Sequence, residues 1–203
     1  MRHSTTTGLT HNRAGLTGHR GFAAGQAGFT LIELLTVVVI VVILMTIAVP
    51  SYRYVTTDNR MSTEANELLG DLQFARSEAA REGQSVTVCA ANSTNPSSPS
   101  CAASGTTTWQ NGWIVFSDLN NDQTIDTNDP VLRIQSAFVG GDTFVSSGTG
   151  ATNLGAFSFN RSGFLNQLGT SQVTVKLQDS TAKAMYTRCL YVTLAGMLSV
   201  KSC

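Results

Sequence analysis

The stretch Gly28-Phe29-Thr30-Leu31-Ile32-Glu33 leads into an apolar run that extends from Leu34 to Val49 and stops at Pro50. The 21 residues from Phe29 to Val49 are uncharged except for Glu33. A helix of that length spans roughly 30 Å, the thickness of a bilayer core. The stretch therefore predicts a membrane-spanning helix, with a kink expected near Pro50 because proline removes a backbone donor.

Glu33 is the feature that an ordinary membrane anchor would not need. An ionised carboxylate in hydrocarbon costs about 3 kcal/mol or more and usually marks a partner or a pathway. If a peptidase cuts between Gly28 and Phe29, the new amino group of Phe29 lies four residues before Glu33 and can neutralise it, within one chain or between neighbours. The alternative is a plain signal anchor with an acid at the positive end of a helix.

These residues resemble the prepilin signature of type IV pilins and type II secretion pseudopilins. The resemblance implies that a prepilin peptidase removes residues 1–28 as a leader on the cytoplasmic side. It also implies that Phe29 is then N-methylated and that Glu33 guides docking into a filament. In a conventional secretory signal the apolar region precedes the cleavage site, whereas here it follows the site and is retained.

The charges of the chain are divided unevenly by this cleavage. The leader holds three of the 13 basic side chains, Arg2, Arg13 and Arg20, and none of the 13 acidic ones, so the chain after residue 28 has a net charge of about −3. Basic residues ahead of the span hold the leader in the cytoplasm and direct the following chain outward. A negative mature chain argues against sequence-independent binding of nucleic acid, which needs a positive face.

Beyond Pro50 the pattern becomes amphipathic. Apolar residues recur at helical spacing at Met61, Ala65, Leu68, Leu69, Leu72, Ala75 and Ala79. Gly83 is placed to end this helix. We therefore expect residues 29–50 to form the membrane or filament-core helix, and residues 51–83 to form its second half, packed on a globular head.

Residues 84–203 predict a head rich in strands. Short β-branched and aromatic runs are separated by turn residues, and they lie at residues 85–90, 112–117, 131–138, 143–146, 156–159, 172–177, 189–194 and 197–201. Turn candidates at residues 161–163 and 195–196 join neighbouring strands. Consecutive strands without helices between them imply an antiparallel sheet or sandwich, so the predicted fold class is α+β, a pilin fold.

Four cysteines lie in the head, and an even number in an exported segment indicates two disulfides. We favour the two local pairings, Cys89 with Cys101 and Cys189 with Cys203. The second would close a loop worth roughly 3 kcal/mol in the chain-entropy model. Zinc is the alternative, but the chain has no Cys-x-x-Cys and its three histidines all lie in the leader.

The head also resembles a particular subgroup. The segment from Trp113 to Asp118 and the segment Asp129-Pro130-Val131-Leu132-Arg133 are similar to the GspH/FimT family of minor pilins and pseudopilins. The resemblance implies a minor subunit that sits near a filament tip and helps to start assembly. Its implied partners are other pilins, the prepilin peptidase and an assembly platform in the bacterial inner membrane.

The turn after Asp118 has oxygen side chains spaced as in the calcium loop of the EF-hand. The candidate calcium ligands are Asp118, Asn120, Asp122, Thr124, Asp126 and Asp129. Gln123 stands where the template has glycine, and Asp129 stands where it has glutamate. The alternative is a polar turn whose side chains bond to their own backbone.

Two other functions are disfavoured. Some relatives bind DNA through a Gly-Arg-x-Arg motif, but the matching place reads Gly196-Met197-Leu198-Ser199 with Lys201 nearby. A positive patch would have to come from scattered cations at Lys176, Lys183 and Arg188. Enzymatic function is the least supported, because no histidine follows the leader and no nucleophile and base set is present.

Overall fold

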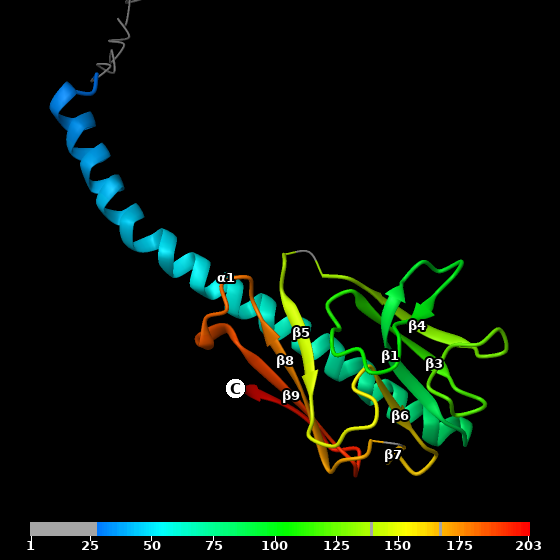
Figure 1. The fold of residues 1–203 in the computed structure, drawn as a ribbon. Coiled ribbons are helices and arrows are strands. Elements are labelled where there is room, and N and C mark those ends of the chain that lie inside the picture. Colours follow the sequence, from blue (N-terminus) through cyan, green and yellow to red (C-terminus); the bar gives the residue numbers. More distant parts are fainter. Residues whose placement is uncertain (1–27, 139, 167) are drawn as a thin grey trace, which may run out of the picture. The chain divides into compact units, whose positions relative to one another are not determined.

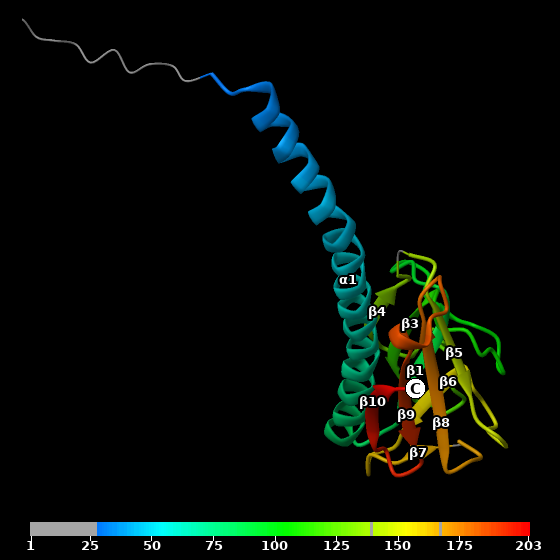
Figure 2. The ribbon, with the colours of Figure 1, turned by 90° about the vertical axis from the view of Figure 1, so that its left-hand side faces the viewer.

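The computed structural model describes residues 28–138, 140–166 and 168–203 (Figures 1 and 2). Apart from Gly28, the predicted leader lies outside the described residues. The chain divides into two compact units, residues 1–45 and 46–203. One helix, α1 (Leu31–Glu82), contributes residues to both units and continues through Pro50 without a break.

The first half of α1 is apolar, and its described side chains are exposed. Its apolar window has a mean hydropathy of 3.0 and no buried residues, and the helix is long and apolar enough to cross a membrane. Phe29 and Leu31 are each 81% exposed. Exposing so many apolar side chains to water is unfavourable, so lipid or neighbouring helices must surround this part of the helix.

The second half of α1 buries one stripe of side chains against the head. The buried residues are Met61, Glu64, Ala65, Leu68, Leu72, Ala75 and Ala79, and six of these seven were predicted from helical spacing. The helix ends at Glu82 because Gly83 adopts a φ of +73° and its N–H donates to the Ala79 carbonyl at 3.0 Å. Glycine reaches this left-handed conformation without a steric penalty.

The head contains two antiparallel sheets. The first has the order β4-β3-β1-β6-β7, with β2 paired to β1 beside that path. Its strands are β1 (Val86–Ser93), β2 (Ser100–Cys101), β3 (Gly112–Ser117), β4 (Val131–Ser136), β6 (Ala156–Phe159) and β7 (Leu165–Asn166). The second sheet has the order β10-β9-β8-β5, from β5 (Thr143–Ser147), β8 (Gln172–Gln178), β9 (Arg188–Thr193) and β10 (Leu198–Ser202).

The predicted α+β class and all eight predicted strands are confirmed. The two strands that the sequence did not predict, β2 and β7, have only two residues each, and a short 3-10 helix, η1 (Ala184–Tyr186), also escaped prediction. Two residues cannot show an alternating pattern, so such strands are recognised only from their neighbours in the fold.

The main core lies between α1 and the sheets. Trp109 and Phe157 stack there with ring centroids 5.0 Å apart, and Trp113 donates from its indole nitrogen to Asp71 on α1 at 2.8 Å. Every residue of β3 is buried, because a second, smaller cluster covers its other face. That outer cluster consists of Cys89, Ala91, Ile114, Phe116 and Ala156, with Cys101, Ile125 and Ile134 packed against it.

Two disulfides join the cysteines that are nearest in sequence. Cys89 on β1 bonds to Cys101 on β2, and Cys189 on β9 bonds to Cys203 just after β10. Their Cα atoms are 5.6 and 5.2 Å apart, in the usual range for a disulfide. These are the local pairings that the sequence favoured, and both hold short peripheral segments against the sheets.

Candidate functional site

The bond between Gly28 and Phe29 lies outside α1. The helix begins at Leu31, and Thr30 caps it, since its side-chain oxygen accepts from the Glu33 amide at 3.3 Å. A threonine followed three residues later by glutamate is a capping-box spacing. This signal was present in the sequence but was not used to predict where the helix starts. The proposed cleavage site therefore lies ahead of the first helical residue.

Glu33 lies in the first turn of α1 and is exposed. Its apolar neighbours Ile32 and Leu34 are 64% and 63% exposed. A carboxylate in the first turn is favoured by the partial positive charge of a helix N-terminus. In this chain Phe29 is still bonded to Gly28, so the charge pair between its amino group and Glu33 stays a prediction.

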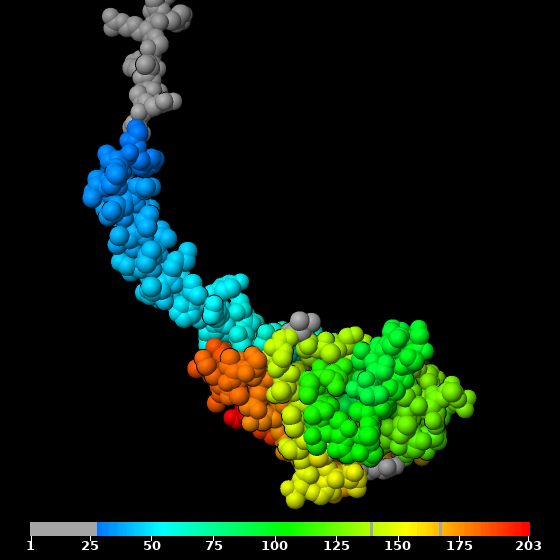
Figure 3. All heavy atoms as spheres, turned by 45° about the horizontal axis from the view of Figure 1, so that its top comes forward, coloured from blue at the N-terminus to red at the C-terminus, as the bar shows by residue number. Residues whose placement is uncertain are grey.

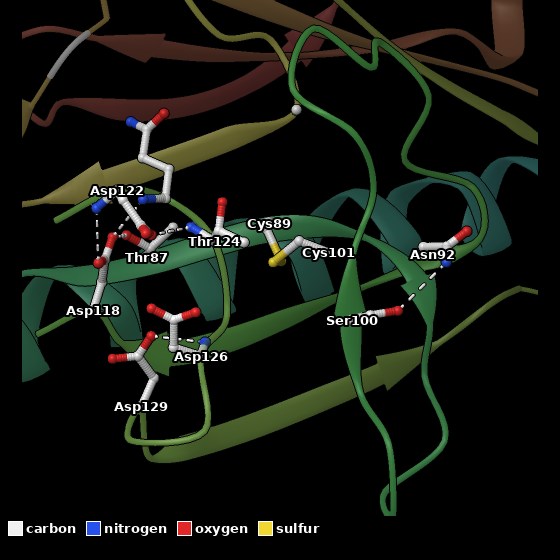
Figure 4. The surroundings of a disulfide bond; sticks show 12 residues. Thr87, Cys89, Asn92, Ser100, Cys101, Asp118, Asp122, Thr124, Asp126 and Asp129 are labelled. Atoms are coloured by element: carbon white, nitrogen blue, oxygen red, sulfur yellow. Dashed lines mark hydrogen bonds between the residues drawn. A yellow bond between two sulfur atoms is a disulfide. The ribbon is translucent and has the colours of Figure 1, made fainter. Parts of the chain in front are cut away.

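The loop from Asp118 to Asp129 is built from its own hydrogen bonds (Figure 4). The buried Asp118 carboxylate accepts from the Thr87 hydroxyl at 2.7 Å and from the amides of Gln123 and Asp122 at 3.0 and 3.2 Å. Asp129 accepts from the amides of Leu119 and Asp126 at 3.1 and 3.0 Å. Both carboxylates are therefore engaged by donors.

The remaining candidate ligands are arranged in the same way. The side-chain amide of Asn120 donates to Asp122 and Asp126 at 2.9 Å each. Asp122 also accepts from the backbone amide of Thr124 at 2.8 Å. Gln123 takes the left-handed conformation, with a φ of +63°, at the position where the calcium template has glycine. Among residues 28–203 outside positions 139 and 167, no three His, Cys, Asp or Glu side chains are grouped to hold a metal ion.

The structure therefore favours the polar turn and gives the calcium prediction no support. The loop has a structural task instead, because Ile125 packs on the outer cluster beside the disulfide Cys89–Cys101. Burial raises the pKa of Asp118, while its hydrogen bonds from Thr87 and two backbone amides act in the opposite direction. Asp118 thus holds the loop over apolar residues that would otherwise face water.

We expect millimolar calcium to leave the thermal stability of the protein unchanged. The reason is that each carboxylate of the loop already accepts hydrogen bonds that a calcium ion would have to replace. Thermal denaturation in calcium and in excess chelator would measure this. A melting temperature that rises with calcium and falls back with chelator would show that the loop is a calcium site.

The cations considered for a DNA-binding patch have different surroundings in the structure. Arg188 is only 14% exposed in its side chain and pairs with Asp58 on α1, and it also donates to the Ser62 hydroxyl at 3.3 Å. It therefore fastens β9 to α1 and is not free for phosphate. Lys176 and Lys201 both lie in register with Cys189 on either side of β9, so they share one face of the second sheet.

A buried cluster of charges on α1 was missed by the sequence analysis. Glu64 is 4% exposed, and Arg60 pairs with Asp142 at 2.8 Å and lies 3.8 Å from Glu64. Burial, followed by the nearby charge of Asp142, raises the pKa of Glu64 to about 7, while Arg60 lowers it. A signal for burial existed, because position 64 is three residues after Met61 and four before Leu68.

Comparison with known proteins agrees with both parts of this arrangement. The family described as "Type II transport protein GspH" matches residues 64–196, and the prokaryotic N-terminal methylation motif matches residues 24–49. No curated protein matches the chain.

The chain was also compared with solved structures, and a minor pilin has a similar fold. In one crystal form the type IV minor pilin FimU of Pseudomonas aeruginosa has a TM-score of 0.50 and 19% identity, covering 69% of this chain and 91% of that one. In a second crystal form FimU has a TM-score of 0.52 and 20% identity, and the match covers 70% of this chain and 89% of that one. The minor pseudopilin EpsH of the Vibrio cholerae type 2 secretion system has a TM-score of 0.46 and 10% identity, covering 70% and 95%.

The family match carries more weight than the likeness to FimU, which shows the fold alone. It extends from the second half of α1, through the first sheet and β5, β8 and β9 of the second, to the turn between β9 and β10. Because it spans more than half of the chain, the protein belongs to the GspH family of type II transport proteins.

Proposed function

We propose that the protein is a minor pilin or pseudopilin, a structural subunit that helps to start assembly of a type IV pilus or a type II secretion pseudopilus. One observation carries this proposal. A methylation motif on a long, uncovered apolar helix and a GspH-type head occur in the same chain. Proteins of this class are structural and are not enzymes, and we assign this chain no catalytic residue.

Processing would begin at residue 28. A prepilin peptidase would cut between Gly28 and Phe29, releasing residues 1–28, and Phe29 would then be N-methylated. The position of this bond just ahead of the capped helix supports the proposal, since a bond outside a helix is not held by helical hydrogen bonds. The basic leader supports a cytoplasmic location for the cut, because positive residues stay inside.

The rest of the chain would then divide by function. Residues 29–50 would anchor the protein in the inner membrane and later pack among sister helices, with a kink near Pro50. Residues 51–83 and the head, residues 84–203, would lie on the periplasmic side. Partners would be other pilins or pseudopilins and the inner-membrane assembly platform, and the subunit would sit near the tip. The continuous, uncovered apolar surface of α1 supports helix packing as the mode of assembly.

We expect Glu33→Ala to reduce incorporation into filaments strongly while leaving the head folded. The new amino group of Phe29 would lose its carboxylate partner, and an unpaired charge in an apolar bundle is costly. Incorporation should fall at least about tenfold, equivalent to roughly 1.4 kcal/mol. Sheared filaments can be quantified by immunoblotting, and N-terminal sequencing of the mature protein should begin at Phe29.

Glu67→Ala is the matched control, because it removes an exposed acid from the same helix outside the apolar run. Its incorporation should equal that of the wild type. Normal incorporation of Glu33→Ala, or a mature N-terminus at any residue other than Phe29, would contradict the proposal. Deletion of the whole protein, assayed for twitching, protein secretion and transformation, would show whether it belongs to a type IV pilus or to a type II secretion system. Loss of transformation alone would instead favour DNA binding.

A further inference from the structure

The part of α1 just past the apolar run carries exposed side chains that suit a membrane surface. The run ends at Val49, and Tyr52, Tyr54 and Val55 follow with exposures of 72%, 45% and 49%. At a rise of 1.5 Å per residue these positions lie roughly 5 to 9 Å beyond the run. The polar zone on each side of a bilayer core has about this thickness. Tyrosine is enriched at that depth, because its apolar ring can face the lipid tails while its hydroxyl hydrogen-bonds to water or headgroups.

A second segment of the head lies at the same level. The rings of Tyr54 and Tyr186 have centroids 5.7 Å apart, so η1 lies beside this turn of α1. Figure 3 shows this segment, in orange, on the surface next to the cyan part of the helix. Tyr186 is 8% exposed, whereas its neighbour Met185 is 57% exposed. The contact between the tyrosines therefore fixes η1 and leaves Met185 pointing outward.

Two unpaired cations lie near η1 and this turn of α1. Arg53 and Lys183 are exposed, and in the described part of the chain no ion pair includes either of them. The acids Asp58 and Asp142 pair with Arg188 and Arg60, and Asp179 accepts from the Thr181 amide at 3.2 Å. An anionic surface would therefore meet two cations here that no described acid pairs with.

We propose that Tyr52, Arg53, Lys183 and Met185 form a surface that seats the head on the anionic headgroups of the bilayer before assembly. The inference rests on the proposed membrane anchoring and adds a lipid contact made by the head itself. Tyr52 and Met185 would enter the apolar side of the interface, while the two cations would bind lipid phosphates. Assembly would then have to lift this end of the head off the membrane.

Tryptophan quenching in vesicles tests the surface directly. The full chain would be reconstituted into vesicles of phosphatidylcholine and phosphatidylglycerol that contain brominated lipid, and the wild-type signal of buried Trp109 and Trp113 would be subtracted. Met185→Trp should lose about half or more of its added emission, as expected for a ring at interface depth. Met197→Trp is the matched control. Met197 is also exposed, but it follows the far end of β9 and should not be quenched.

Further variants separate the possible failures. The double variant Arg53→Gln and Lys183→Gln should reduce quenching of Met185→Trp to the level in vesicles without phosphatidylglycerol. Val42→Trp, inside the apolar run, reports insertion of the helix alone. Quenching of Val42→Trp without quenching of Met185→Trp would overturn this inference only, whereas quenching of neither would overturn the anchoring. Shielding of Met185→Trp only after partner pilins are added would show that the surface binds protein instead of lipid.

Discussion

Replacing Gly196 with alanine should destabilise the head by about 4 kcal/mol, a large fraction of the stability of a domain this size. Gly196 has a φ of +73°, which costs an L-residue roughly 1 to 2 kcal/mol. A Cβ there would also lie 2.0 Å from the carbonyl oxygen of Gly163 and 3.1 Å from Nε of Arg76. The turn would have to move, and the bond from Arg76 to the Gly196 carbonyl, now 2.8 Å, would be lost.

Gly83→Ala is the control for this prediction. Gly83 has the same φ of +73°, but a Cβ there would meet no atom within 4 Å. Gly83→Ala should therefore destabilise the head only through the strained backbone conformation, by about 1 to 2 kcal/mol. Urea denaturation of the detergent-solubilised protein, followed by near-ultraviolet circular dichroism, would measure both changes. Equal losses for the two variants would show that the contact between the turns contributes nothing.

The case of Gly196 also shows what local sequence can predict. The turn at residues 195–196 was predicted, because glycine after a β-branched run is a local signal. Its contact with Gly163 and with Arg76 on α1 was not predicted, since 120 residues separate Arg76 from Gly196. Such a contact depends on how two turns meet in the tertiary fold, and neither turn has a sequence pattern that predicts the other as its partner.

The membrane helix and the strands were predictable because each repeats a local pattern of burial. The acidic loop shows what such a local pattern leaves open, and calcium binding there stays a prediction. Its spacing satisfied a ligand template, but the structure uses Asp118 and Asp129 to bind backbone amides above the outer cluster. The position of Arg188 likewise depends on a partner on α1, Asp58, that is distant in sequence. The role of such a polar residue depends on its hydrogen-bond or ion-pair partner, and that partner is set by the tertiary fold.

The stability of the head should fall as the pH rises from about 5 to about 8, and Glu64 should be the main cause. Its pKa is raised from 4.5 to about 7 by burial and by the charge of Asp142. Between these values the unfolded chain releases the proton while the folded protein retains it, so each step in pH favours unfolding. A shift of this size corresponds to a loss of up to about 3 kcal/mol. Asp118, whose pKa is also raised by burial, acts in the same direction.

The geometry explains why the folded protein keeps this proton. Oε2 of Glu64 and Oδ2 of Asp142 are both buried without a hydrogen-bond partner, so a proton on Glu64 allows the two carboxyl groups to bond. Arg60 then balances Asp142, and Glu67 is the other charged group that acts on Glu64. Glu64→Gln should keep a donor toward Asp142 without titrating, so its stability should vary less with pH in urea denaturation. Glu67→Gln should keep most of the slope, because Glu67 contributes least to the raised pKa of Glu64. An unchanged slope in Glu64→Gln would place the titrating group elsewhere.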